Sequence, residues 1–331
     1  MDITTVTDDL IVAHDGPEVI RLSGLDPDTE YTVGNQTVRT STRPGGTMLC
    51  RFVTVNDVHF GEVECGKIDD DPAGPIQRAD SGDPPYPALM NAAAIREIAE
   101  LHPVAVIAKG DLSGDGRPDE WAAFEANYRG SFGDRLFAVR GNHDAYHGQN
   151  QYAGDQWIEL PGVAVALLDT TIPTKTTGWL SADQLDWLEA RADTSDRPVM
   201  VMGHHQQWVG TTRSPDYFGM HPDASDALSA VIERRPSIVA YTAGHTHRHR
   251  RRMLDSGVPT IEIGCVKDFP GTWAEYRVYE GGISQVVHRI SAPEALRWSE
   301  RCRHLYSDFG MDYETYALGR LEDRCFTIAL R

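Results

Sequence analysis

The amino-acid sequence predicts a layered α/β fold with mixed β-sheets. Segments with the short apolar pattern of strands alternate with segments of helical spacing through the middle of the chain, and strands then predominate. Polar residues also gather where successive strands end, at Asp57-Val58-His59, Gly110-Asp111, Gly141-Asn142-His143-Asp144, Gly203-His204-His205 and Gly244-His245-Thr246-His247. Because α/β folds bind ligands at the ends of their strands, these clusters predict one shared site.

The N-terminal residues 1–46 have the pattern of short strands. Gly34-Asn35 is a hairpin signal between two of them, and Arg43-Pro44-Gly45-Gly46 has the composition of a linker. We therefore expect a small β-rich appendage over residues 1–46, a domain over 47–290 that contains all five polar clusters, and a C-terminal extension over 291–331.

Alternating strands and helices are expected within the domain over 47–290. The expected strands are residues 52–55, 104–108, 136–139, 163–168, 199–202 and 238–241, with further strands near 253, 261, 276 and 286. The expected helices are residues 88–101, 118–128, 181–188 and 223–234, the third of them with Ser181 as N-cap and Gln184 completing a capping box. A long Gly/Pro/Asp-rich loop covers roughly 61–87. In the extension we expect a helix at 293–306 and a strand at 326–330.

The composition bounds the partners and the compartment. The net charge of the 331 residues is −18, which argues against a nucleic acid partner, since that needs a basic face. The same charge argues less against a small anionic substrate, because a metal ion reverses the local sign. The chain shows no signal peptide and no apolar run of membrane-spanning length. Its five cysteines have no CxxC pairing, so we expect a cytoplasmic protein with reduced thiols. Since no apolar run is long enough to span a membrane, we expect no membrane partner.

Seven residues of the strand-end clusters have the chemistry of metal ligands. Hard or borderline divalent cations take carboxylate, carbonyl and imidazole ligands. The sequence offers such ligands at Asp57, His59, Asp111, Asn142, His204, His245 and His247. The i, i+2 spacing of Asp57 and His59, and of His245 and His247, points each pair the same way from extended backbone. Asp111 is the natural carboxylate to bridge two cations. Asp57, His59 and His247 would then serve one metal, and Asn142, His204 and His245 the other.

Two neighbouring cations predict hydrolysis at phosphorus. They polarise a phosphoryl group and hold a hydroxide formed from water near neutral pH. His143 would donate a proton to the leaving oxygen or stabilise its charge, with Asp144 or another acceptor on its far nitrogen. The sequence contains no Gly-x-Ser-x-Gly elbow and no phosphate-binding Gly/Lys loop that would favour another mechanism.

Taken in order, the five motifs resemble those of the calcineurin-like metallophosphoesterase superfamily over roughly residues 50–290. The resemblance implies two packed mixed β-sheets flanked by helices in four layers. It also implies a dinuclear centre of iron, manganese or zinc with the division of ligands given above.

A shorter stretch is similar to the bacterial class III cyclic nucleotide phosphodiesterases. It comprises Leu168-Asp169-Thr170-Thr171, Gly178-Trp179-Leu180-Ser181 and Gln184-Leu185-Asp186-Trp187-Leu188. Asn56 and Gln206 depart from that subgroup, which often has Ser or Thr and Pro at these places. The departures leave every ligand in place and concern the shape of the pocket.

The sequence thus predicts a dinuclear-metal phosphoesterase that hydrolyses small phosphodiesters by a metal-bound hydroxide. The resemblance makes 3′,5′-cyclic AMP the first candidate substrate. A phosphomonoesterase, or a phosphodiesterase for glycerol-type or nucleotide-linked diesters, is the alternative. A non-catalytic metal-bound scaffold is disfavoured, because a scaffold has no use for Asn142 and His143 together. A homo-oligomer is compatible with the sequence.

Three features leave alternatives open. The basic run Arg248–Arg252 is either a source of phosphate-binding charge or, as we favour, a strand that neutralises acidic neighbours. His205 either lines the pocket or buttresses His204. The loop near 61–87 and the tail near 305–320, with Tyr306, Tyr313 and Tyr316, are both long enough to cap the site.

Overall fold

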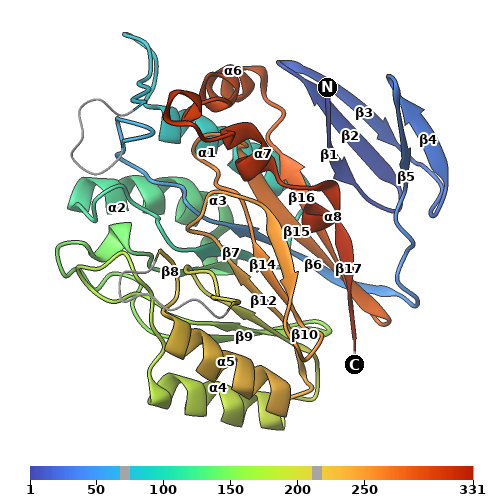
Figure 1. The fold of residues 1–331 in the computed structure, drawn as a ribbon, viewed down its shortest axis with the longest axis vertical. Helices are drawn as coiled ribbons and strands as arrows, with labels where there is room; N and C mark the ends of the chain where they lie inside the picture. The colour runs from blue at the N-terminus through green and yellow to red at the C-terminus, as the bar shows by residue number, and fades with distance from the viewer. Residues whose placement is uncertain (68–74, 211–217, 331) are drawn as a thin grey trace.

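The computed structural model describes residues 1–67, 75–210 and 218–330, and its centre is a pair of six-stranded sheets packed face to face (Figure 1). The first sheet has the order β17-β16-β15-β6-β7-β8, with strands Phe326–Ala329, Gly282–Arg289, Thr272–Tyr279, Met48–Val55, Val106–Lys109 and Leu136–Val139. The second has the order β13-β14-β12-β11-β10-β9, with strands Arg250–Met253, Pro259–Glu262, Ile238–Ala243, Val199–Met202, Val163–Leu167 and Gln156–Leu160. Both sheets mix parallel and antiparallel pairs, which confirms the predicted fold class.

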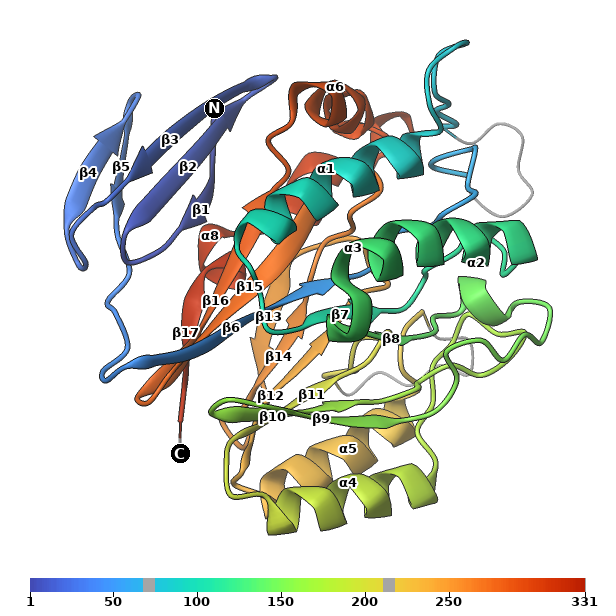
Figure 2. The same ribbon diagram turned by 180° about the vertical axis from the view of Figure 1, so that it is seen from behind.

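Helices cover the outer face of each sheet (Figures 1 and 2). Three of them, α1 (Tyr86–Glu100), α2 (Pro118–Phe124) and α6 (Pro293–Cys302), pack on the first sheet, and α4 (Ala182–Thr194) and α5 (Pro222–Arg234) pack on the second. Each sheet is therefore buried on both faces. This is why strands such as Val199–Met202, with four buried residues, read as continuous apolar runs in the sequence.

β6 shows how one strand serves two cores. Phe52 packs in the layer between the sheets, whereas Val53 and Val55 pack against α1 and its neighbours. Successive side chains of β6 point to opposite faces and so enter both cores. The strand ends at Val55, just before the polar cluster that begins at Asp57.

Most expected elements are present. The strand at 199–202 and the capping box of Ser181 and Gln184 are confirmed. The helix expected at 118–128 continues as a π-helical turn at Glu125–Arg129, and the one expected at 293–306 ends at Cys302. Four elements were not expected from the sequence, namely β1 (Asp2–Val6), β9, α7 (Tyr313–Leu318) and α8 (Leu321–Arg324). All four are short, and β9 carries Gln156 and Glu159 because it is an edge strand.

The N-terminal residues form a three-stranded sheet of β1, β2 (Leu10–Asp15) and β3 (Glu18–Ser23) and a hairpin of β4 (Glu30–Val33) and β5 (Gln36–Arg39). They have a small core of their own, which includes Ile3 and Ile11. β1 lies against β16, where the Thr5 hydroxyl donates to the Val287 carbonyl at 2.7 Å. The appendage is therefore docked on the first sheet, while the boundary at residue 46 stays a prediction.

The chain after residue 290 crosses the molecule and returns to the first sheet. α6 packs beside α1, α7 follows, and β17 adds to the edge of β16 (Figure 1). The loop near 61–87 has no helix or strand in its described residues 61–67 and 75–85, and residues 68–74 lie outside the described part. No helix of the described chain combines the length and the apolar character needed to span a bilayer.

Candidate metal centre

The five polar clusters meet at one edge of the paired sheets. Each follows the end of β6, β7, β8, β11 or β12, so parallel strands deliver the clusters to the same place. Six of the seven predicted ligands are buried and His247 is partly exposed; the buried ones are Asp57, His59, Asp111, Asn142, His204 and His245. A deeply buried cluster of acids and imidazoles is costly unless its members are paired or bind a cation.

The expected extended backbone at the paired ligands is wrong. Asp57 and His59 have φ of +52° and +45°, and His245 and His247 have φ of +69° and +54°. β6 ends at Val55 and β12 at Ala243, so these residues lie in tight turns beyond the strands. Left-handed backbone at non-glycine residues is strained and persists where the surroundings enforce it. Here the side chains converge because of the turns, and not because of an i, i+2 alternation.

Asp57, His59 and His247 form the first ligand group. Their ligand atoms lie within 4.8 Å of one another, and Asp57 Oδ1 is 3.4 Å from His247 Nε2. The other carboxylate oxygen of Asp57 accepts hydrogen bonds from Asn56 Nδ2 at 2.6 Å and from the His245 amide at 3.0 Å. These two hydrogen bonds fix the orientation of the Asp57 carboxylate, and Asn56 supplies one of them.

Asn142, His204 and His245 form the second group. His204 Nδ1 donates to the Lys109 carbonyl at 2.9 Å, which leaves Nε2 facing Asn142 Oδ1 at 3.0 Å. His245 Nε2 is buried and has no hydrogen-bond partner in the described structure. Burial, together with the nearby charge of His204, lowers the pKa of His245 to about 3. The His245 imidazole is thus neutral at pH 7. Burial opposes the charge of His204, but the Asp111 carboxylate raises the pKa of His204 to about 9, so that ligand would lose a proton when a cation binds.

Asp111 lies between the two groups. Its Oδ2 is 3.5 Å from His59 Nε2 and 3.2 Å from His204 Nε2. Burial raises the pKa of Asp111, but the charges of His204 and His143 outweigh it and hold that pKa well below its usual value. His59 Nε2, like His245 Nε2, is buried without a hydrogen bond among the described residues. An ionised carboxylate between the imidazole nitrogens of His59 and His204 fits two cations of the iron, manganese or zinc kind.

His205 is a buttress. Its Nδ1 lies 2.8 Å from Thr170 Oγ1 and its Nε2 lies 3.0 Å from the Thr176 carbonyl, so both ring nitrogens are engaged by the protein. The ring packs at 4.9 Å from that of His204. Although its ligand atoms are close enough to His204 and His245 to share a cation, neither nitrogen is free.

His143 enters the site beside Asp111. Its amide donates to Asp111 Oδ1 at 3.0 Å, and its Nδ1 donates to the Gly114 carbonyl at 2.8 Å. The acceptor on the far nitrogen is thus Gly114 and not Asp144. The Asp144 carboxylate instead accepts from the amides of Gly141 at 2.7 Å and Ser113 at 2.8 Å, tying two strand-end loops together. Burial lowers the pKa of His143.

A cavity of about 240 Å³ opens onto the ligands. Besides Asp111, Asn142, His143, His245 and His247, it is lined by Tyr146, Thr176, Phe218, Thr246, Tyr306, Met311, Tyr313 and Tyr316. The Tyr316 hydroxyl donates to the Thr246 carbonyl at 3.0 Å. Thr246 stands in the sequence between the predicted ligands His245 and His247. The C-terminal tail therefore forms one wall of the site. Tyr146, Phe218 and Met311 were not expected there, and nothing in their sequence context marks them.

The basic run neutralises acidic neighbours, as favoured. Arg248 and Arg252 bind the buried Glu262 carboxylate at 2.7 Å and 3.1 Å, and Arg251 lies over the Phe326 ring. None of these arginines lines the cavity at the metal ligands as far as the chain is described.

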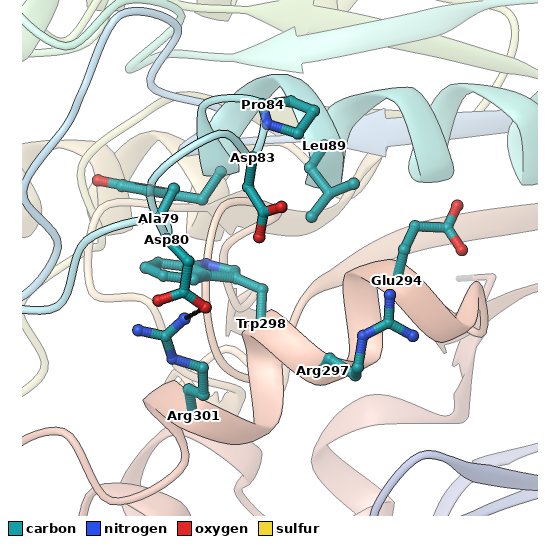
Figure 3. A pocket seen from close by; sticks show the side chains of 10 residues that line it. Ala79, Asp80, Asp83, Pro84, Leu89, Glu294, Arg297, Trp298 and Arg301 are labelled. Carbon is teal, nitrogen blue, oxygen red and sulfur yellow. Dashed lines mark hydrogen bonds and ion pairs between the residues drawn. The ribbon is translucent and has the colours of Figure 1, made fainter.

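A second cavity, of about 310 Å³, lies between residues 79–86 and α6 (Figure 3). Arg301 and Asp80 form an ion pair at 3.0 Å across it, and Trp298 stacks on Tyr86 at its floor. None of the seven predicted ligands lines this cavity.

Known proteins share this sequence pattern and fold. Residues 50–249 match the family described as calcineurin-like phosphoesterase. A probable cyclic nucleotide phosphodiesterase of Synechococcus sp. is 28% identical over 181 residues, which cover 53% of this chain and 68% of that protein. A glycerophosphodiester phosphodiesterase of Enterobacter lignolyticus is 29% identical over 167 residues, which cover 44% of this chain and 56% of that protein.

The solved structure of a dimetal phosphatase from Danio rerio has a similar fold. Its TM-score is 0.58 at 16% identity, and the match covers 86% of this chain and 100% of that one. At this identity the likeness concerns the fold alone. It agrees with the two packed mixed sheets flanked by helices described above.

Proposed function

Since the chain belongs to the calcineurin-like phosphoesterase family and has the fold and site of a metal-dependent phosphoric ester hydrolase, we propose that it is a phosphodiesterase for small phosphodiesters, with 3′,5′-cyclic AMP the first candidate substrate. The observation that carries the proposal is the position of Asp111 between the two ligand groups, with His143 hydrogen-bonded to it. This arrangement supports a polar group for the leaving oxygen beside a site for two cations.

Two cations at these ligands, of iron, manganese or zinc, supply Lewis-acid polarisation of the phosphoryl group and an activated water. The chain contributes the rest. Asp111 holds the two ligand groups together, and Asn142 offers a neutral oxygen beside the entering substrate. His143 keeps Nε2 for the leaving oxygen, because Nδ1 is occupied by Gly114. Because Nδ1 carries the hydrogen donated to Gly114, Nε2 carries a proton only when the ring is an imidazolium. In that form His143 would donate the Nε2 proton to the leaving oxygen or stabilise its developing charge.

The wall of the cavity supports a substrate with a flat substituent. Tyr306, Tyr313 and Tyr316 all line the site, and an aromatic ring beside a nucleobase contributes stacking energy. We infer that the extension over 291–331 caps the site formed by the domain over 47–290. The relative named a cyclic nucleotide phosphodiesterase agrees with this substrate class.

The alternative is a glycerol-type or nucleotide-linked diester, or a phosphomonoester. The relative named a glycerophosphodiester phosphodiesterase favours the first of these. The net charge of −18 supports a small substrate over a nucleic acid. We further propose a cytoplasmic location with no membrane partner, and a homo-oligomer remains compatible with the fold.

A turnover panel on manganese-reconstituted protein tests the proposal, with Asn142→Ala as the blank. The panel contains cyclic AMP, bis(p-nitrophenyl) phosphate, a glycerol-type diester and p-nitrophenyl phosphate. Release of 5′-AMP that is lost in the variant supports the first candidate. Rapid cleavage of the synthetic diester with feeble action on cyclic AMP keeps the reaction and discards that substrate. Silence on all four substrates with metal present contradicts the proposed function.

A further inference from the structure

A tight turn brings the carboxylate of Glu62, which has no part in the mechanism above, close to the predicted metal ligand His59. The Glu62 amide donates to the His59 carbonyl at 3.1 Å, and Gly61 has φ of +89°, a conformation that favours glycine. The turn folds the Glu62 side chain back, so that Oε2 lies 2.6 Å from His59 Nδ1. The other nitrogen of His59, Nε2, is thereby left facing Asp111.

Glu62 is itself held from two other parts of the chain. Lys267 Nζ lies 2.5 Å from Oε1, and the Tyr86 hydroxyl donates to the same oxygen at 2.6 Å. Lys267 is only 5% exposed, and its carbonyl accepts a hydrogen bond from Trp298 Nε1 at 3.0 Å. Trp298 and Tyr86 stack on each other and both line the second cavity. The carboxylate therefore has one defined position.

The second imidazole of the same ligand group also has a carboxylate behind it. Asp268 Oδ2 lies 3.8 Å from His247 Nδ1 and 3.5 Å from Lys267 Nζ. The Cys265 thiol donates to Asp268 Oδ1 at 2.8 Å. Lys267 thus stands between two carboxylates, each of which faces the far nitrogen of one histidine ligand.

We propose that Glu62 and Asp268, held together by Lys267, are positioning residues that fix His59 and His247 for cation binding at the Asp57 group. The inference rests on the proposed metal-dependent function and deepens it. A carboxylate on the far nitrogen of a histidine ligand fixes the tautomer and the ring orientation and makes the coordinating nitrogen more basic. A buried ion pair is by itself poor evidence for stability, so a contribution to the metal site is the better account of this charged chain.

The test is Mn²⁺ binding to Glu62→Gln, measured by electron paramagnetic resonance of free Mn²⁺ and by metal content after dialysis. Glutamine keeps the size of the side chain but removes the charge behind His59. We expect the affinity of the tighter-binding Mn²⁺ to fall about 10- to 100-fold. Glu64→Gln is the matched control, because the Glu64 carboxylate pairs only with Arg78 among the described ion pairs and faces no metal ligand. Its Mn²⁺ affinity should match that of the unaltered protein.

The single variant leaves Lys267 buried beside a neutral partner, so its fold is checked by thermal unfolding of the metal-free protein. The double variant Glu62→Gln/Lys267→Met removes both charges of that pair and leaves Asp268 its hydrogen bond from the Cys265 thiol. Weak Mn²⁺ binding in the folded double variant supports the inference, and the single variant is expected to show the same loss. Unchanged Mn²⁺ affinity in the double variant overturns it, while the proposed function would survive. Failure of the unaltered protein to bind any of Mn²⁺, Fe²⁺ and Zn²⁺ would contradict the proposed function itself.

Discussion

The two ligand groups share Asp111 but differ in what lies behind their imidazoles. In the group of Asp57, His59 and His247, carboxylates of Glu62 and Asp268 face the far ring nitrogens. In the group of Asn142, His204 and His245, the far nitrogen of His204 meets the neutral carbonyl of Lys109. Asn142 itself is neutral where the first group has Asp57.

The difference is one of charge and of rigidity. The first group carries its own carboxylate and is supported by two more, so it is suited to hold a cation permanently. The second group depends on Asp111 for all of its negative charge. We therefore propose that the first group holds its cation more tightly, for a structural task, and that the cation beside Asn142 serves catalysis.

The largest expected effect comes from removing the residue that both groups share. Asp111→Asn keeps the shape of the side chain but removes the charge between the groups, and we expect kcat/KM on bis(p-nitrophenyl) phosphate to fall about a thousandfold. Asp115→Asn, at an exposed carboxylate that pairs with His147, is the control. Activity within tenfold of the unaltered protein would refute the bridging position.

A smaller effect on activity is expected from removing the His143 side chain, which should lower turnover and leave metal binding unchanged. His143→Ala removes a ring that belongs to neither proposed ligand group, although it packs at 4.5 Å from the His59 ring. We therefore expect metal content to be unchanged while kcat falls about a hundredfold. The loss should be larger for esters with poor leaving groups, which need the proton most. His147→Ala, an exposed histidine four residues away, serves as the comparison. Equal losses for good and poor leaving groups would remove the acid role.

Stepwise chelation sharpens the comparison of the two groups directly. Protein loaded with two Mn²⁺ ions per chain is titrated with dipicolinate, and the spin-coupled signal is followed beside the total metal content. We expect the cation at Asn142, His204 and His245 to leave first, at an affinity about tenfold weaker, since the far nitrogen of His204 meets the neutral Lys109 carbonyl and no carboxylate of the described residues. Loss of both cations together would mean that the carboxylates beside the first group do not raise its affinity for a cation above that of the second group.

The smallest effect is expected at the tail. Tyr316→Ala removes a ring that lines the cavity, and KM for cyclic AMP should rise about fivefold. KM for a glycerol-type diester should stay within twofold, because it has no base to stack. Tyr316→Phe isolates the hydrogen bond to the Thr246 carbonyl. Equal KM changes for both substrates would exclude the tail from substrate selection.

The sequence was sufficient for the architecture because strand ends and polar clusters coincide in it. The predicted ligands lie together in the structure, and the strands and helices of the central domain follow their apolar patterns. The direction of the ligand side chains was not predictable in the same way. The strands stop at Val55 and Ala243, and the left-handed turns that follow depend on contacts between loops, such as the His245 amide on Asp57.

The residues near the far ring nitrogens of the histidine ligands were not expected from the sequence, for a different reason. Glu62 stands in a Gly/Asp-rich loop, and Lys267 stands beside Asp268, so both read as surface charges. Only tertiary structure joins positions 62 and 267 across two strand-end loops. The one available signal was the spacing of three residues between His59 and Glu62, which a turn makes a contact.

The tail wall of the cavity also fixes an order of events during synthesis. Every predicted metal ligand precedes His247 or is His247 itself, whereas Tyr306, Tyr313 and Tyr316 come later in the chain. A ribosome therefore completes the ligand cluster before it adds the tyrosines that cover one side of it. Cations can enter the nascent protein while that side is open, and the last strand, β17, then anchors the cover by pairing with β16.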